Sequence, residues 1–214
     1  MNSVVIQLNS ALPSPESIRQ LPHFKSLSPE NIVVIQHLEQ CHAIDHELNH
    51  AAVLGFDTES KPTFVKGEVS TGPHLIQLAT HKKAYLFQVN PETLSFLHPI
   101  LANPDQIKVG FGLKNDKHLF RKKGIELNAI VDLAKSFGAF GIKTQMGVKN
   151  AVALLFQQHF VKNKKISTSN WAKKNLTTEQ IQYAAADAYA PVLIFEELLR
   201  LGSLHKTLLK PPLK

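Results

Sequence analysis

The sequence has few of the features that mark secreted, membrane-spanning or zinc-binding proteins. Its one cysteine, Cys41, excludes an internal disulfide framework and favours a reducing compartment. No apolar run approaches the roughly 20 residues that span a bilayer, and the N-terminus lacks the basic start and apolar core of a secretory signal. The histidines show no zinc-ligand spacing. We therefore expect a cytoplasmic protein that does not contact a membrane.

What is present is the composition of a globular domain with a surplus of positive charge. The chain has 214 residues, 43% of them hydrophobic, which suffices for one domain with a substantial core. We expect residues 1–30, rich in proline, to form an N-terminal extension that packs on a single domain at 31–214. The formal net charge is +7. Such a surplus attracts polyanions, so nucleic acid is the expected partner if other residues agree.

Alternating strand and helix patterns predict an α/β fold. The short link His81-Lys82-Lys83 between two apolar runs suits a hairpin and antiparallel pairing. Further along, strands alternate with helices, which indicates parallel crossovers. The prediction is a mixed sheet, antiparallel in its first three strands and parallel in the remainder, with helices on both faces. Strands are expected at 31–36, 52–57, 74–80, 84–89, 107–111 and 129–131, and helices at 37–49, 91–101, 113–123, 147–159 and 178–201.

Two carboxylates close the apolar run that predicts the central strand, Val53-Leu-Gly-Phe-Asp57-Thr-Glu59. Strand alternation puts Asp57 and Glu59 on one face, roughly 6.6 Å apart along the strand. Two such groups repel each other, so their burial requires a counter-charge. A divalent cation supplies it most simply, and oxygen ligands favour Mg²⁺ or Mn²⁺ over zinc.

Further acidic residues and a tyrosine complete a candidate set. Asp116 follows the predicted strand and the small residues of Gly110-Phe-Gly, which places it near the start of a helix. Tyr183 and Asp187 lie four residues apart and project from one helical face, with alanines between them. All these groups meet if the last helix crosses the carboxyl end of the Asp57 strand. Carboxylates holding two ions roughly 3.5–4 Å apart suit in-line displacement at phosphorus.

These motifs resemble those of a known enzyme group. The matches are Gly55-Phe-Asp57-Thr-Glu59 with Lys61-Pro62 after it, Gly110-Phe-Gly-Leu-Lys-Asn-Asp116, Ser169-Asn-Trp171 and Tyr183-Ala-Ala-Ala-Asp187. They resemble the 3′→5′ exonucleases of the ribonuclease H-like (DnaQ-like) superfamily, in the DEDDy branch with four acids and a tyrosine. The likeness is nearer to the exonuclease domain of the Werner syndrome helicase than to ribonuclease D. A sister branch carries histidine where this chain has Gln182.

The resemblance implies a ribonuclease H-like fold and stepwise release of nucleoside monophosphates from 3′ ends of nucleic acid. It implies that two ions, Mg²⁺ or Mn²⁺, are held by Asp57, Glu59, Asp116 and Asp187, with Asp57 bridging both. Tyr183 would orient the attacking water, because a phenol with a pKa near 10 is a poor base at neutral pH. At position 118, where Werner-like domains carry tryptophan, this chain has His118.

Other polar residues receive weaker assignments. Asp132 ends an apolar stretch and is interpreted as a helix cap, Trp171 as a packing anchor and Cys41 as a core residue. The basic run at 162–165 is usually a solvated feature, but beside acidic metal ligands it could contact phosphate. The candidates for nucleic-acid contact are Thr58, Lys61, Lys143, Lys149, Lys162, Lys164 and Lys165.

Two alternatives to the leading hypothesis remain open at the level of sequence. One is an inactive module that only binds nucleic acid, against which the four intact acids argue. The other is an enzyme that trims RNA 3′ ends as ribonuclease D does. A mild preference for DNA rests on the nearer Werner-like match, since no residue in the sequence distinguishes the sugar.

Overall fold

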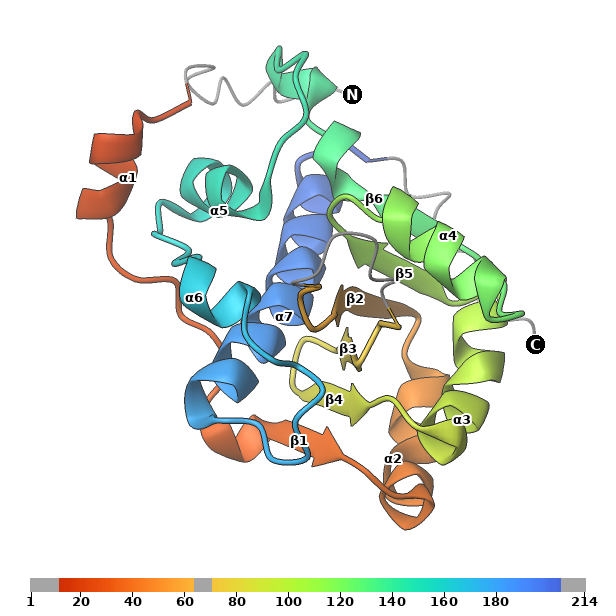
Figure 1. The fold of residues 1–214 in the computed structure, drawn as a ribbon. Helices are drawn as coiled ribbons and strands as arrows, with labels where there is room; N and C mark the ends of the chain where they lie inside the picture. Colours follow the sequence, from red (N-terminus) through yellow and green to blue (C-terminus); the bar gives the residue numbers. More distant parts are fainter. Residues whose placement is uncertain (1–11, 64–70, 205–214) are drawn as a thin grey trace.

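A six-stranded mixed sheet forms the centre of the protein in a computed structural model, which describes residues 12–63 and 71–204. The strand order is β1-β4-β3-β2-β5-β6, so the strand that carries Asp57 and Glu59 is internal. Figure 1 shows the ribbon. The strands are β1 (Ile32–Ile35), β2 (Val53–Glu59), β3 (Leu75–Ala79), β4 (Ala84–Gln88), β5 (Ile107–Gly110) and β6 (Ile130–Asp132).

The pairing confirms the predicted mixed sheet. The three central strands β2, β3 and β4 are antiparallel, and β5 and β6 continue from β2 in parallel. The sequence did not predict the position of β1, which lies at the edge and pairs in parallel with β4. Helix α2 (Leu38–His50) crosses one face of the sheet and connects β1 at the edge with the internal strand β2.

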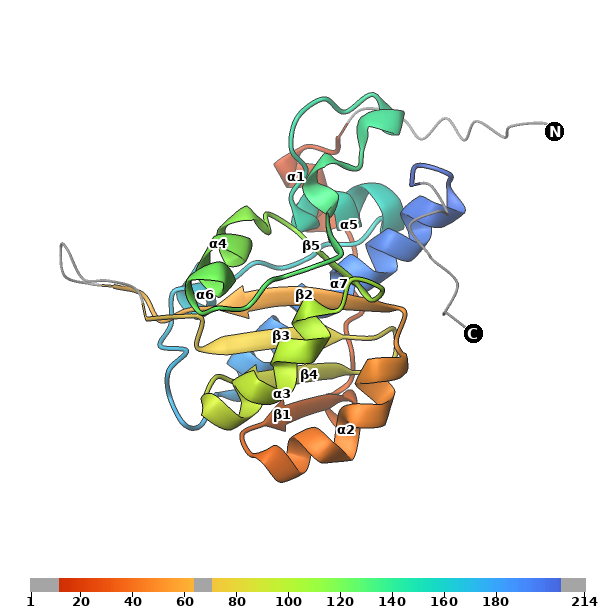
Figure 2. The ribbon, with the colours of Figure 1, turned by 90° about the vertical axis from the view of Figure 1, so that its right-hand side faces the viewer.

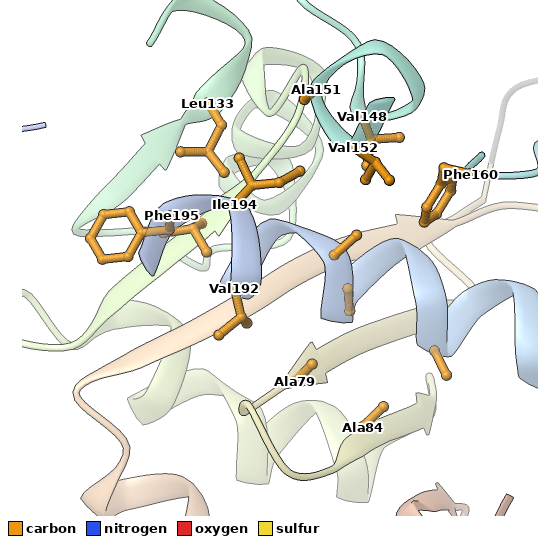
Figure 3. Packing of buried hydrophobic residues seen from close by; sticks show 14 of the residues in the cluster. Ala79, Ala84, Leu133, Val148, Ala151, Val152, Phe160, Val192, Ile194 and Phe195 are labelled. Atoms are coloured by element: carbon orange, nitrogen blue, oxygen red, sulfur yellow. The ribbon is translucent and has the colours of Figure 1, made fainter. Parts of the chain in front are cut away.

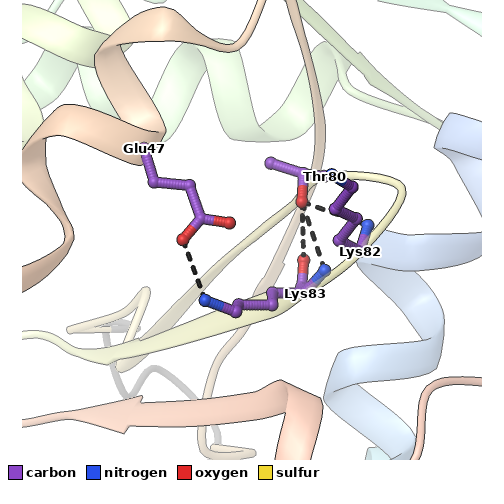
Figure 4. A network of polar contacts seen from close by, with 4 residues as sticks. All are labelled: Glu47, Thr80, Lys82 and Lys83. Carbon is purple, nitrogen blue, oxygen red and sulfur yellow. Dashed lines mark hydrogen bonds and ion pairs between the residues drawn. The ribbon is translucent and has the colours of Figure 1, made fainter.

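A polar turn fixes the predicted hairpin between β3 and β4. The hydroxyl of Thr80 accepts hydrogen bonds from the backbone N–H groups of Lys82 and Lys83, both at 3.2 Å. The ammonium of Lys83 reaches Glu47 on α2 at 3.0 Å (Figure 4). The turn therefore satisfies its own backbone groups and is tied to a neighbouring helix, which supports the register of the two strands.

Helices cover both faces of the sheet, as predicted. Helix α7 (Thr178–Arg200) crosses one face, whereas α2 and α3 (Pro91–Ala102) pack on the other (Figures 1 and 2). The core beneath α7 includes Val192, Ile194 and Phe195, together with residues of helix α5 (Val148–Phe156) (Figure 3). The opposite core also receives Phe120 of helix α4 (Lys114–Lys122). Alternate residues of each central strand enter the two cores.

The ends of several elements agree with the sequence or differ from it by a few residues. Helix α5 stops at Phe156 and not at 159, because Gln157 adopts a left-handed conformation with φ of 53°. The basic run at 162–165 was expected in a loop, but its last two residues begin the short helix α6 (Lys164–Ser167). Asp132 caps the 3₁₀ turn η2 (Leu133–Lys135), as predicted. The buried positions of Cys41 and Trp171 confirm that both are packing residues.

Part of the expected N-terminal extension falls within the described residues. Helix α1 (Pro15–Gln20) begins at Ser14, whose hydroxyl accepts from Ser17 N–H, and the short turn η1 (Pro29–Asn31) precedes β1. Between them the chain runs beside residue 159, where His159 N–H donates to the Pro22 carbonyl at 2.8 Å. A third 3₁₀ turn, η3 (Gly138–Phe140), precedes α5. Within the described ranges no helix is both long enough and apolar enough to cross a bilayer.

Candidate active site

The end of β2 presents its two acids to the face covered by α7. Leu54 and Phe56 enter the core under α2 and α3, so Gly55, Asp57 and Glu59 point the other way. Asp57 lies opposite Gln77 of β3 in the antiparallel register. The backbone N–H of Thr58 donates to the Asp57 carboxylate at 2.8 Å. Strand alternation thus places both carboxylates where the last helix passes.

A glycine and a series of alanines allow α7 to approach β2 closely. A Cβ atom at Gly55 would lie 1.8 Å from the carbonyl oxygen of Ala188 and 2.8 Å from Val192. Ala184, Ala185 and Ala188 are fully buried on the facing side of the helix. Asp187 directly precedes the closest contact and is 4% exposed. Small residues on both elements, Gly55 on β2 and the alanines on α7, therefore permit this close approach.

Asp116 reaches the same region from the opposite side. It lies in the first turn of α4, which begins after β5 and a turn with Gly112 at φ of 71°. The hydroxyl of Thr58 donates a hydrogen bond to the Asp116 carboxylate. Thr58, predicted to contact nucleic acid, therefore positions an acidic residue. Figure 1 shows α4 on one side of β2, and α7 with α6 beyond it on the other.

A lysine contacts two members of the candidate set, Asp187 and Tyr183. The ammonium of Lys162 lies 2.6 Å from each carboxylate oxygen of Asp187 and 3.4 Å from the hydroxyl of Tyr183. It also lies 5.1 Å from the centre of the Tyr183 ring. The Lys162 side chain is 38% exposed, whereas that of Asp187 is 2% exposed. The sequence predicted a phosphate contact for Lys162; the structure places it on a predicted metal ligand.

Electrostatic interactions connect several of these groups. Burial, then the charge of Asp187, raises the pKa of Asp57 well above its ordinary value, and the ammonium of Lys162 opposes that shift. Burial and the neighbouring Asp57 raise the pKa of Glu59 to about 9. Burial also raises the pKa of Asp116 and of Asp187, which Lys162 partly offsets in the latter. Four crowded carboxylates with raised pKa values hold less negative charge than they would in water.

Tyr183 belongs to this electrostatic group. Burial and the charge of Asp187 raise the pKa of its phenol to about 12. The phenol therefore stays protonated at neutral pH and can offer a hydrogen bond. This agrees with a positioning role and argues against proton removal by Tyr183. The ring packs against buried Trp171, with 6.1 Å between ring centres.

The donor set fits a hard divalent cation. Asp57, Glu59, Asp116 and Asp187 offer carboxylate oxygens, and a cation among them would relieve the repulsion that raises their pKa values. In the arrangement of the described residues, however, no three Asp, Glu, His or Cys side chains already form a metal-binding group. Both oxygens of Asp187 are instead paired with Lys162. The residues match the chemistry of the ion, and one of them, Asp187, is paired with a lysine.

The other lysines proposed for nucleic-acid contact lie at various distances from the acids. Lys61 follows β2, and its backbone N–H donates to His74 at 3.2 Å. Lys164 and Lys165 are exposed on α6, which contacts α7. Lys149 lies in the first turn of α5, and Lys143 lies in the segment that precedes this helix. Among the lysines predicted to contact nucleic acid, the structure brings only Lys162 into contact with the acids.

Sequence reasoning missed two features beside the site. Gln77 is completely buried, faces the α7 side opposite Asp57, and has no protein partner for either amide atom. Its signal is a polar residue inside the apolar run Leu75–Ala79. A cavity of about 460 Å³ also opens beside Tyr183, lined in part by Phe24 of the N-terminal extension and by Phe160. Phe24 and Phe160 are far apart in the chain, so no local pattern in the sequence predicts that they line one cavity.

Comparisons with known proteins agree with this geometry. Residues 32–202 match the family model described as 3′-5′ exonuclease. The bifunctional 3′-5′ exonuclease/ATP-dependent helicase WRN of Mus musculus is 28% identical over 182 residues, which is 81% of this chain and 13% of that protein. A putative 3′-5′ exonuclease of Acanthamoeba polyphaga mimivirus is 30% identical, over 68% of this chain and 39% of that protein. The chain thus spans well under half the length of both relatives.

Solved structures share the fold. The Nibbler EXO domain of Aedes aegypti superposes with a TM-score of 0.71 at 23% identity, covering 88% of this chain and all of that one. Ribonuclease D of Escherichia coli gives a TM-score of 0.67 at 23% identity, covering 83% and 48%. The matched family region contains all four acids and the tyrosine at the carboxyl end of β2. The chain therefore belongs to the 3′-5′ exonuclease family.

Proposed function

We propose that the protein is a metal-dependent 3′→5′ exonuclease that releases nucleoside monophosphates from nucleic-acid ends. The observation that supports it most is the meeting of Asp57, Glu59 and Asp187 with Asp116 beside them, from three separate elements. Proteins of this family generally use divalent metal ions. Binding of phosphate alone would be served by lysines and backbone N–H groups and would not need four acids.

Each residue has a definite part in the proposed reaction. Asp57, Glu59 and Asp187 would hold one Mg²⁺ or Mn²⁺ ion, and Asp57 with Asp116 a second. When bound, such ions lower the pKa of the attacking water and neutralise charge on the phosphoryl oxygens. Tyr183, protonated because its pKa is about 12, would orient that water through its hydroxyl. The water oxygen forms a bond to phosphorus as the bond to the preceding 3′ oxygen breaks, and that oxygen takes up a proton.

A 3′-labelled oligonucleotide tests this function. With Mg²⁺ or Mn²⁺ the label should be released as a mononucleotide, and a blocked 3′-hydroxyl should suppress the release. Asp57→Asn keeps the shape of the side chain but removes a charged ligand, so cleavage should fall by several orders of magnitude. Asp45→Asn, the same change at an exposed position of α2, serves as the control. Full cleavage by Asp57→Asn would refute the assignment.

The substrate class is a separate part of the proposal. We propose a mild preference for DNA, supported by the relationship to WRN, whose name records a helicase joined to an exonuclease. The alternative is trimming of RNA ends, supported by the fold shared with the structure titled Escherichia coli RNase D, an exoribonuclease involved in structured RNA processing. Rates on DNA and RNA of the same sequence distinguish the two. Binding without turnover under either metal would favour an inactive binding module.

A further inference from the structure

Lys162 is the one predicted phosphate-binding lysine that contacts a predicted metal ligand. Its ammonium takes both oxygens of Asp187 at 2.6 Å, so a cation can bind Asp187 from that side only if the ammonium moves. Asp187 is nearly fully buried, and burial of a charged carboxylate without a counter-ion is costly. In this arrangement Lys162 is the counter-ion that satisfies it.

The way Lys162 is held allows that movement. The residue precedes α6 in an exposed segment, and its ammonium contacts the Tyr183 hydroxyl and lies 5.6 Å from the centre of the Phe160 ring. A lysine stem is flexible and ends in a compact, well-hydrated charge, unlike the rigid fork of arginine. With 38% of the side chain exposed, the ammonium can leave Asp187 towards solvent without repacking of the core.

We propose that Lys162 is an exchanging counter-ion: it neutralises Asp187 until a divalent cation binds there, and then transfers to a phosphate of the nucleic acid. This inference rests on the proposed function, because it requires a cation at Asp187 and a phosphate beside it. At the start Asp187 is paired with Lys162, and at the end Asp187 is paired with the cation and Lys162 with a phosphate. The ammonium also lessens the repulsion among the buried acids before the cation arrives.

The exchange predicts that removal of Lys162 changes the affinities for metal and for nucleic acid in opposite directions. Without Lys162, a cation no longer competes with an ammonium for Asp187, so affinity for the metal should rise. The phosphate loses a positive partner, so affinity for nucleic acid in the presence of metal should fall. A lysine that merely supported the fold would weaken both interactions when removed. The direction of the two changes therefore identifies the role.

Calorimetric titration of the metal-free protein with Mn²⁺ alone tests the first half. We expect Lys162→Met to bind Mn²⁺ about 2- to 5-fold more tightly than the unaltered protein, as expected for loss of one partly exposed competing charge. Lys162→Arg should bind more weakly, because a guanidinium grips a carboxylate with two parallel hydrogen bonds. Lys164→Met removes the same charge from an exposed position on α6 and should bind Mn²⁺ unchanged.

Fluorescence anisotropy with an oligonucleotide that ends in a 3′ phosphorothioate, in Mn²⁺, tests the second half. Lys162→Met should lower affinity about 3- to 10-fold, and the salt dependence should decrease by about one charge. Mn²⁺ affinity that is equal or lower in Lys162→Met would overturn the exchange. So would tighter Mn²⁺ binding that persists when Asp187→Asn is added to both proteins, since the lysine then acts through other charges. If the unaltered protein binds no Mn²⁺, the proposed function fails instead.

Discussion

Gly55 offers a sharp test of how α7 is positioned on β2. In Gly55→Ala the added methyl group would stand 1.8 Å from the Ala188 carbonyl oxygen, where ordinary contact begins at 3.4 Å. The obstructing atom belongs to backbone, so no side chain can rotate away. Helix α7 must therefore retreat by about 1.6 Å, the difference between the two distances. Asp187, the residue before Ala188, would retreat with it.

Two effects of Gly55→Ala can be given magnitudes. Forcing extra volume into a close-packed interface costs typically about 1–3 kcal/mol, and we expect the upper part of that range because both surfaces are regular elements. A displacement of about 1 Å in a reacting group can cost about 100-fold in rate. Urea unfolding measures the first effect, and release of a 3′-terminal nucleotide measures the second.

Gly138→Ala provides the matched control for this experiment. A Cβ atom at Gly138 would meet nothing within 4 Å, and the backbone there has no positive φ. Its stability should stay within about 0.5 kcal/mol of the unaltered protein. A Gly55→Ala protein with unchanged stability and unchanged cleavage would refute the inferred contact between β2 and α7.

Three further predictions concern buried polar groups. The pKa of Glu59, raised to about 9, lies above its unfolded value, so the contribution of Glu59 to stability is fully present below pH 4.5 and is lost as pH rises towards 9. In EDTA at pH 7, Glu59→Gln should therefore be more stable than the unaltered protein by at most about 3 kcal/mol, whereas Glu39→Gln at an exposed position of α2 should not be. Equal urea midpoints for the unaltered protein and Glu59→Gln would contradict this. Burial lowers the pKa of Lys108 to about 8 although its ammonium donates to the carbonyls of Ile100 and Asn103; the unfolded chain then binds more protons between pH 8 and about 10.5, so stability should rise over that range. Lys108→Met should remove that rise, and an unchanged slope in urea unfolding would contradict the burial effect. Gln77→Met, which replaces two buried atoms without protein partners, should raise stability by about 1 kcal/mol; a loss of stability would mean that the amide is hydrogen-bonded in solution.

The sequence was sufficient to predict the parts of the site that depend on local periodicity. Asp57 and Glu59 share a face because strands alternate, and Tyr183 and Asp187 share one because they are a helical turn apart. The hairpin and the cap at Asp132 also depend on neighbours in the chain, and the structure confirms them.

The features that escaped prediction depend on residues far apart in the chain. Lys162 lies in a basic run of a kind that is usually solvated, and only the packing of the α6 segment on α7 places it against Asp187. The importance of Gly55 appears only when α7 is placed across β2. The parallel pairing of β1 with β4 follows from strand order, which hydrophobic periodicity does not encode.

The most direct test of the central claim is the anomalous diffraction signal of Mn²⁺ in crystals of this protein. The account predicts a peak bound by Asp57, Glu59 and Asp187, with the Lys162 ammonium moved away from Asp187. A well-occupied Mn²⁺ elsewhere in the molecule, with the pair of Lys162 and Asp187 intact, would contradict it.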